Sequence, residues 1–154
     1  MTIRYRPLPT ETVADLWAGG TDAYGMQPER RDSDGDGVPC RHCLDMVPAG
    51  AAYLVLAHRP FPALQPYAET GPIFLHAEPC RPFSGPGMPP MLDSSDYIVR
   101  GYDADDRIVY GTGAVTPTPE IAAYAETLLA RPDIAYVHVR SARNNCYQCR
   151  IERA

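Results

Sequence analysis

The spacing of hydrophobic positions predicts two helices. Apolar residues recur every three or four positions from Glu11 to Ala18 and, more regularly, from Pro119 to Ala130. This is the period of a helix with one buried face. Thr10 and Thr118 precede these segments and suit the N-cap position. The apolar stripes are Val13, Leu16 and Trp17 in the first helix, and Ile121, Tyr124, Ala125, Leu128 and Leu129 in the second.

Six other segments have the apolar or alternating pattern of strands. The first, Ala51–His58, is apolar at nearly every position, which is typical of a central strand covered on both faces. Residues 103–106 are turn formers and predict a hairpin between their neighbours. The expected strands are Ala51–His58, Pro72–Glu78, Asp96–Tyr102, Arg107–Ala114, Ile134–Arg140 and Cys146–Arg153. Strands linked mainly by hairpins predict an α+β fold, with a largely antiparallel β-sheet and two helices packed against it.

Two segments lack a regular pattern. Gln27–Pro39 is polar and rich in turn formers, and it contains the opening of a calcium loop at residues 32–37. The twelfth position of that loop is Cys43 instead of the required glutamate, so we interpret it as a plain turn. Pro79–Ser94 is rich in proline and glycine, and loops of this length are often functional. Two interpretations stay open. The segment is a lid or binding loop, or it is a rigid loop on the surface without a function of its own.

Composition narrows the class of protein. A chain of 154 residues fits a single domain, here residues 1–154. The net charge of −5 argues against binding to nucleic acid, which needs a basic surface. No apolar run has the length of a membrane span and the N-terminus lacks a signal-peptide core, so we expect a cytoplasmic protein. In that compartment the five cysteines are thiols, metal ligands or catalytic groups rather than disulfides.

The last expected hairpin gathers chemically active side chains. If the turn places Arg140 opposite Cys146, then Cys149 lies opposite Val137 on the core face, as a buried structural thiol. The opposite face of the two strands then carries a group that we call the Arg/Cys/His patch: Tyr136, His138, Arg140, Cys146, Gln148 and Arg150. The alternative is a solvated sheet face on which the arginines pair with carboxylates.

This patch suggests a pocket for a small anionic molecule. Arginines beside a thiol lower its pKa and can hold a carboxylate or phosphate. In an enzyme of this kind, Cys146 or Cys40 would be the nucleophile and His138 the general base. The expected ligand-binding residues are Arg41, Arg100, Tyr136, Arg140, Gln148 and Arg150. All 14 basic residues of the chain are arginines. This reflects either the base composition of the genome or a need for guanidinium groups, whose forked hydrogen-bond donors match a carboxylate or phosphate.

Two C-x-x-C motifs offer a different function. Four thiolates can hold a structural zinc ion, and the motifs supply Cys40, Cys43, Cys146 and Cys149. The signal is weakened because Leu44 and Arg150, rather than small residues, follow the pairs. The second pair also lies in an expected strand, where such positions point to opposite faces. A mixed site would instead combine some of these thiolates with Cys80, His76 or His138.

Several short motifs resemble a known family. They are Pro39–Leu44, Gly71–Phe74, Val99–Tyr102, and Cys146-Tyr147 with Arg150. Together they are similar to domain-of-unknown-function family 1203, a group of bacterial proteins of comparable length. The resemblance covers nearly the whole chain and implies no established activity. Three functions therefore stay as alternatives: an anion pocket that is either a binding site or a Cys/His enzyme, a zinc-binding interaction module, and a non-catalytic scaffold. The sequence indicates neither a substrate nor an oligomeric state.

Overall fold

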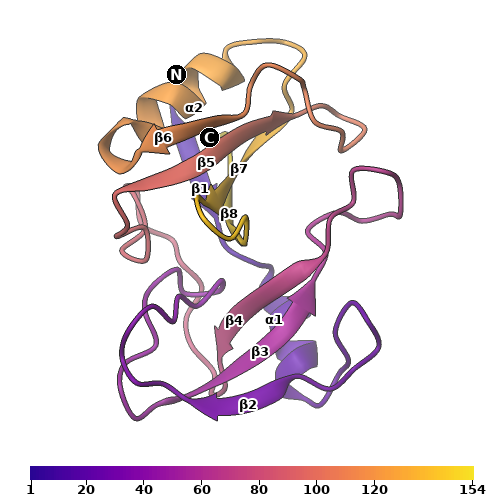
Figure 1. Ribbon diagram of the computed structural model, residues 1–154, viewed down its shortest axis with the longest axis vertical. Helices are drawn as coiled ribbons and strands as arrows, with labels where there is room; N and C mark the ends of the chain where they lie inside the picture. Colours follow the sequence, from indigo (N-terminus) through magenta and orange to yellow (C-terminus); the bar gives the residue numbers. More distant parts are fainter.

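Two antiparallel sheets, each packed against one helix, make up the computed structural model, which describes residues 1–154 (Figure 1). We call the five-stranded sheet with helix α2 the upper lobe, and the three-stranded sheet with helix α1 the lower lobe. The expected α+β class is confirmed. The helices, however, are divided between two sheets instead of sharing one.

The upper lobe has the strand order β1-β8-β7-β5-β6, with every neighbouring pair antiparallel. It therefore joins the first strand of the chain to the last. A 3₁₀ turn at Thr118–Glu120 leads into α2. The elements are β1 (Ile3–Arg6), β5 (Asp96–Tyr102), β6 (Ala114–Pro117), α2 (Ile121–Leu129), β7 (Tyr136–Ser141) and β8 (Tyr147–Arg153).

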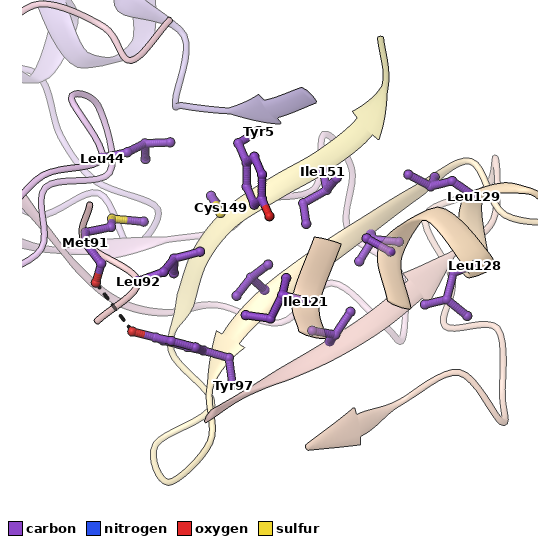
Figure 2. Packing of buried hydrophobic residues seen from close by; sticks show 14 of the residues in the cluster. Tyr5, Leu44, Met91, Leu92, Tyr97, Ile121, Leu128, Leu129, Cys149 and Ile151 are labelled. Carbon is purple, nitrogen blue, oxygen red and sulfur yellow. Dashed lines mark hydrogen bonds between the residues drawn. The ribbon is translucent and has the colours of Figure 1, made fainter. Parts of the chain in front are cut away.

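The apolar stripe of α2 packs on the upper sheet and forms the larger core. Ile121, Leu128 and Leu129 of the helix are buried in one cluster with strand residues that include Ile151 (Figure 2). The core also contains residues from outside the lobe's regular elements. Leu44 and Met91 enter it from two loops, and the Tyr97 hydroxyl donates a hydrogen bond to the Met91 carbonyl oxygen. Through Leu44 and Met91, the upper core packs against the loops that run between the two lobes.

The lower lobe consists of α1 (Thr10–Trp17), β2 (Glu29–Asp32), β3 (Ala52–His58) and β4 (Gly71–His76), with the strand order β2-β3-β4. Its core joins Val13 and Leu16 of α1 to the buried strand residues Leu54, Leu56, Ile73 and Leu75. Only alternate residues of β3 are buried, so the expectation that this strand is covered on both faces is wrong. Its apolar run reflects one buried face and one half-buried face.

Several element boundaries differ from the expected ones. The strand expected at Arg107–Ala114 is absent, because β5 pairs instead with the later β6 at its opposite end. The residues in between form no strand, but they contact the end of β5 through the isolated bridge of Tyr102 with Ile108 and through hydrogen bonds of Val109 and Thr112 with Gly101. The pattern also missed β1 and β2; the latter lies inside the expected turn-rich segment and is exposed at all four residues. Neither Thr10 nor Thr118 acts as a side-chain cap.

The last hairpin forms, but its register differs from the expected one. His138 pairs with Arg150, and Val139 pairs with Cys149, a shift of two residues that leaves Cys149 on the core face as expected. A bulge then breaks the alternation, because Arg140 pairs with Tyr147. Tyr147 therefore joins the face of Arg140 and His138, in the place where Gln148 and Cys146 were expected.

The long segment at 79–94 contains no helix or strand. It is nevertheless anchored at two points, because the backbone N–H of Phe83 donates to the His42 carbonyl and that of Met91 donates to the Leu44 carbonyl. Neither helix of the protein has the length and apolar character required to cross a membrane.

Candidate functional site

Three thiols and an imidazole meet at one end of the lower sheet. We call Cys40, Cys43, His76 and Cys80 the Cys/His cluster; their potential ligand atoms all lie within 4.8 Å of one another. Cys40 Sγ is 3.9 Å from Cys80 Sγ, and Cys43 Sγ is 3.5 Å from His76 Nδ1. Tetrahedral zinc with normal bond lengths places two sulfurs about 3.8 Å apart and a sulfur and a nitrogen about 3.6 Å apart. The cluster is therefore compatible with zinc binding.

A tight turn carries the first two thiols. The backbone N–H of Leu44 donates to the Cys40 carbonyl at 2.9 Å, and the backbone N–H of His76 donates to Cys40 Sγ at 3.3 Å. Leu44 has a φ of 54°, in the left-handed region that a small residue would adopt more easily. The turn therefore requires the conformation that a small residue adopts most easily, as expected, and Leu44 adopts it nonetheless. Its side chain is fully buried in the upper core, which offsets a backbone cost of about 1–2 kcal/mol.

The crowding of the thiols favours negative charge at Cys40. Hydrogen bonds from the thiols of Cys43 and Cys80 hold the pKa of Cys40 well below its usual range. The same contacts raise the pKa of Cys43 to about 11 and also raise the pKa of Cys80. Ionisation of Cys40 therefore disfavours ionisation of the other two thiols. A bound cation would remove this penalty, because a metal deprotonates the thiols that coordinate it.

A second layer of contacts ties the cluster to α1. His42 Nδ1 lies 3.2 Å from Cys80 Sγ, and His42 Nε2 lies 2.9 Å from the Thr10 hydroxyl at the start of the helix. Burial lowers the pKa of His42, and the neutral ring can donate from Nδ1 to the sulfur while it accepts from Thr10. Trp17 packs edge-on against His42 and donates to the His76 carbonyl oxygen. Such contacts fix the orientation of ligands in metal sites.

The second C-x-x-C motif does not join this cluster. Cys149 lies in the upper core, where burial raises its pKa to about 12. Cys146 is half-buried, and its Sγ lies 3.8 Å from the Asn144 carbonyl oxygen. The structure thus brings Cys40 and Cys43 together with His76 and Cys80, and not with Cys146 and Cys149. His138 is also outside the cluster.

Most of the Arg/Cys/His patch is buried; Cys146 and Arg150 are partly exposed, and Arg150 pairs with a carboxylate as the alternative interpretation expected. The side chain of His138 is 0% exposed, and its ring lies 4.6 Å from that of Tyr102, 5.1 Å from that of Tyr136 and 4.9 Å from that of Tyr147. Burial, followed by the charge of Arg140, holds its pKa well below 6.5. No hydrogen bond joins it to Cys146 or Cys40, so the proposed base and nucleophiles are not brought into contact.

Two of the expected anion-binding arginines hold a carboxylate of the protein itself. Arg100 Nη2 lies 3.1 Å from Glu69 Oε1, and Arg140 Nη1 lies 3.3 Å from Glu69 Oε2. The side-chain amide of Asn145 also donates to Glu69 Oε2, at 3.0 Å. Glu69 belongs to the loop between β3 and β4, so a lower-lobe loop fills the arginine clamp of the upper sheet.

The other expected ligand residues make separate contacts. Arg150 lies over the Tyr136 ring at 3.7 Å and pairs with Glu152, while the Tyr136 hydroxyl donates to Asp106. Gln148 is buried at the bulge and donates to the Cys146 carbonyl oxygen. Arg41 is buried without a carboxylate partner. Its Nε donates to the Tyr147 carbonyl in the upper lobe, and its Nη1 donates to the Pro39 carbonyl in the lower lobe.

Sequence analysis missed several residues of these sites. His42 sits inside the first C-x-x-C motif, and this position was a signal that we did not use. Glu69, Thr10, His58 and Asn145 stand in no motif, and only the folded chain places them. His58, at the end of β3, packs beside Tyr147 with a ring-centroid distance of 5.6 Å.

His58 leads to a prediction about pH. Burial, then the charges of Arg41 and Arg140, lowers its pKa from 6.5 to about 4. Below pH 6.5 the unfolded chain therefore takes up a proton that the folded chain does not. The free energy of unfolding should fall by about 1 kcal/mol for this group between about pH 7 and pH 5.5. Urea unfolding at both pH values should show a smaller fall in His58→Gln. An equal fall in both proteins would contradict the prediction.

Fold and cluster together define an α+β protein with two lobes and a Cys₃His cluster in the lower one. The family described as "Protein of unknown function (DUF1203)" matches residues 37–153. The chain belongs to this family, as its motifs suggested, and the matched region contains all four members of the cluster. No curated protein and no solved structure matches the chain significantly.

Proposed function

We propose that the chain binds one structural zinc ion through Cys40, Cys43, His76 and Cys80. The observation that carries the proposal is the convergence of four ligand atoms from three separate chain segments at distances that suit a tetrahedral ion. Three soft sulfur ligands and one imidazole favour zinc over the hard cations magnesium and calcium.

The proposed ion has a structural role because the protein fills all four positions. Catalytic zinc sites keep a position open for water or substrate, whereas four protein ligands close the coordination shell. The neighbours of the cluster support the same role. Through His42, the ion would stabilise the attachment of α1, and through Leu44 it would fix the turn that enters the upper core. Zinc would thus hold the lower lobe together and position Leu44 in the upper core.

A Cys/His enzyme is supported less well by the same geometry. Its base, His138, is enclosed by tyrosine rings and makes no contact with either candidate thiol. Cys40, the second candidate nucleophile, is fully buried within the proposed metal site. We therefore propose that the clustered cysteines act as metal ligands rather than as nucleophiles.

Native mass spectrometry tests the proposal. Protein produced in zinc-supplemented medium and purified without chelators should carry one zinc ion per chain. Cys80→Ser should lose most of this zinc, because it removes one of four ligands. Cys146→Ser is the matched control, since it also replaces a half-buried free thiol but lies outside the cluster, and it should keep one ion. Metal-free wild-type protein, or equal loss in both variants, would refute the site.

A further inference from the structure

The junction of the two lobes contains more positive than negative charge. Arg41 and Arg140 are each 3% exposed, and the Arg100 side chain is 15% exposed. Among the acidic residues, only Glu69 pairs with any of these three, and it is shared by Arg100 and Arg140. Buried charges are normally paired, and the whole chain is acidic, with a net charge of −5. A concentration of buried guanidinium groups is therefore unusual for this protein.

A pocket of about 210 Å³ lies beside this carboxylate. Arg140 and His58 line it, and each has a buried nitrogen without a hydrogen-bond partner: Nε of Arg140 and Nε2 of His58. Buried nitrogens without a partner are costly and rare, so the space that borders both side chains is a candidate binding site. We call this the arginine pocket; its other polar lining residues are Glu69, Thr70, Asn144, Asn145, Cys146 and Tyr147.

We propose that the arginine pocket binds a small oxyanion, the carboxylate or phosphate group of a small molecule, and that the Glu69 carboxylate occupies this position when the ligand is absent. Arg100, Arg140 and Asn145 converge on the two Glu69 oxygens from β5, β7 and the turn before β8. Donors that converge from separate elements on one carboxylate have the geometry of an oxyanion site.

Glu69 is suited to leave the site. Its side chain is 36% exposed and it lies on the loop between β3 and β4, so it can turn toward solvent without disturbing either sheet. An incoming oxyanion would then accept from the same three donors. Its oxygens would take the places of the two Glu69 oxygens among Arg100, Arg140 and Asn145.

The pocket adjoins a larger cleft between the lobes. His58, Pro60 and Tyr147 line both spaces, and the cleft has a volume of about 1100 Å³. A ligand could therefore place its anionic group among the arginines and its organic part toward the cleft. The site uses none of the proposed zinc ligands, so it does not depend on metal binding.

The test compares anion binding by zinc-loaded wild-type protein, Glu69→Gln and Glu29→Gln. Glu29 is a matched control because it pairs with Arg31 on the exposed surface of β2. Inorganic phosphate, succinate and chloride are titrated at constant ionic strength while the thermal unfolding midpoint is followed. We expect phosphate or succinate to bind Glu69→Gln at least about tenfold more tightly than wild type, because the competing closed state is lost. Glu29→Gln should behave as wild type.

The outcomes separate the sources of the oxyanion and decide the proposal. A preference for phosphate indicates a phosphorylated ligand, and a preference for succinate indicates a carboxylate. Equal responses in wild type, Glu69→Gln and Glu29→Gln, or no preference over chloride, would mean that Glu69 is a permanent structural partner and would overturn the proposal. If Glu69→Gln does not fold, phosphate or succinate should restore folding, because either replaces the missing carboxylate. Failure of both to do so would also overturn it.

Discussion

Removal of zinc with a strong chelator is expected to lower the free energy of unfolding by at least about 5 kcal/mol. The four proposed ligands come from the turn after β2, the end of β4 and the loop beyond it, so the ion would cross-link three segments of the chain. The chain's single tryptophan, Trp17, contacts both His42 and the His76 backbone, so its fluorescence reports on the site directly. Urea unfolding followed by this fluorescence, with and without chelator, measures the effect.

Two buried cysteines give a matched pair for this experiment. Cys40 and Cys149 are both 0% exposed, but only Cys40 belongs to the cluster. Cys149→Ser should weaken core packing and still lose stability on chelation. Cys40→Ser should already be destabilised and should respond little to chelator. A Cys40→Ser protein that responds to chelation as strongly as wild type would show that the stabilising metal is bound elsewhere.

Replacement of Arg41 by leucine is expected to cost about 3 kcal/mol of stability. The guanidinium spans the lobes by donating to the carbonyl oxygens of Tyr147 and Pro39, at 2.8 and 2.7 Å. Leucine would fill part of the volume but leave both carbonyl groups without this partner. Burial lowers the pKa of Arg41 to about 10, so the group stays charged near neutral pH and its loss removes a charge as well as two hydrogen bonds.

The shape of the side chain should matter as much as its charge. Arg41→Lys keeps a cation but cannot donate in the forked geometry that reaches both carbonyls, so we expect it to be destabilised by a similar amount. Arg30→Leu is the control, because Arg30 makes only an exposed ion pair with Glu78 and should change stability by less than about 1 kcal/mol. Chemical denaturation of the variants gives the values. An Arg41→Leu protein as stable as Arg30→Leu would contradict the role of Arg41 between the lobes.

The sequence predicted the elements whose side chains follow a strong period. Helix α2 and strands β5, β7 and β8 lie within two residues of their expected ends, because each buries one regular face against the upper core. Strand β2 was missed because all four of its residues are exposed and charged, so its pairing with β3 leaves no hydrophobic signal. The hairpin expected between β5 and the segment at 107–114 does not form. A sequence that favours a turn does not determine which later segment pairs with β5, and here it is β6.

The candidate site was predictable only in part, for a similar reason. The C-x-x-C spacing identified Cys40 and Cys43, since two thiols three residues apart can share an ion within one turn. His76 and Cys80 were named only as alternatives to the second motif. The choice depends on the bridge between Cys40 and Phe74 of β4, which brings His76 to the turn. Glu69 has no local signature, because its partners are separated from it by 31 and 71 positions along the chain.

The pairing of β1 with β8 has a consequence for folding during synthesis. Ile3 pairs with Arg153, so β1 has no partner until residues 150–153 have left the ribosome. By contrast, the lower sheet and all four proposed zinc ligands lie within the first 80 residues. We expect the lower lobe to fold around its metal first and the upper sheet to close last, because contacts distant in sequence form slowly. Zinc availability while the chain is being made, rather than afterwards, would then set the yield of folded protein.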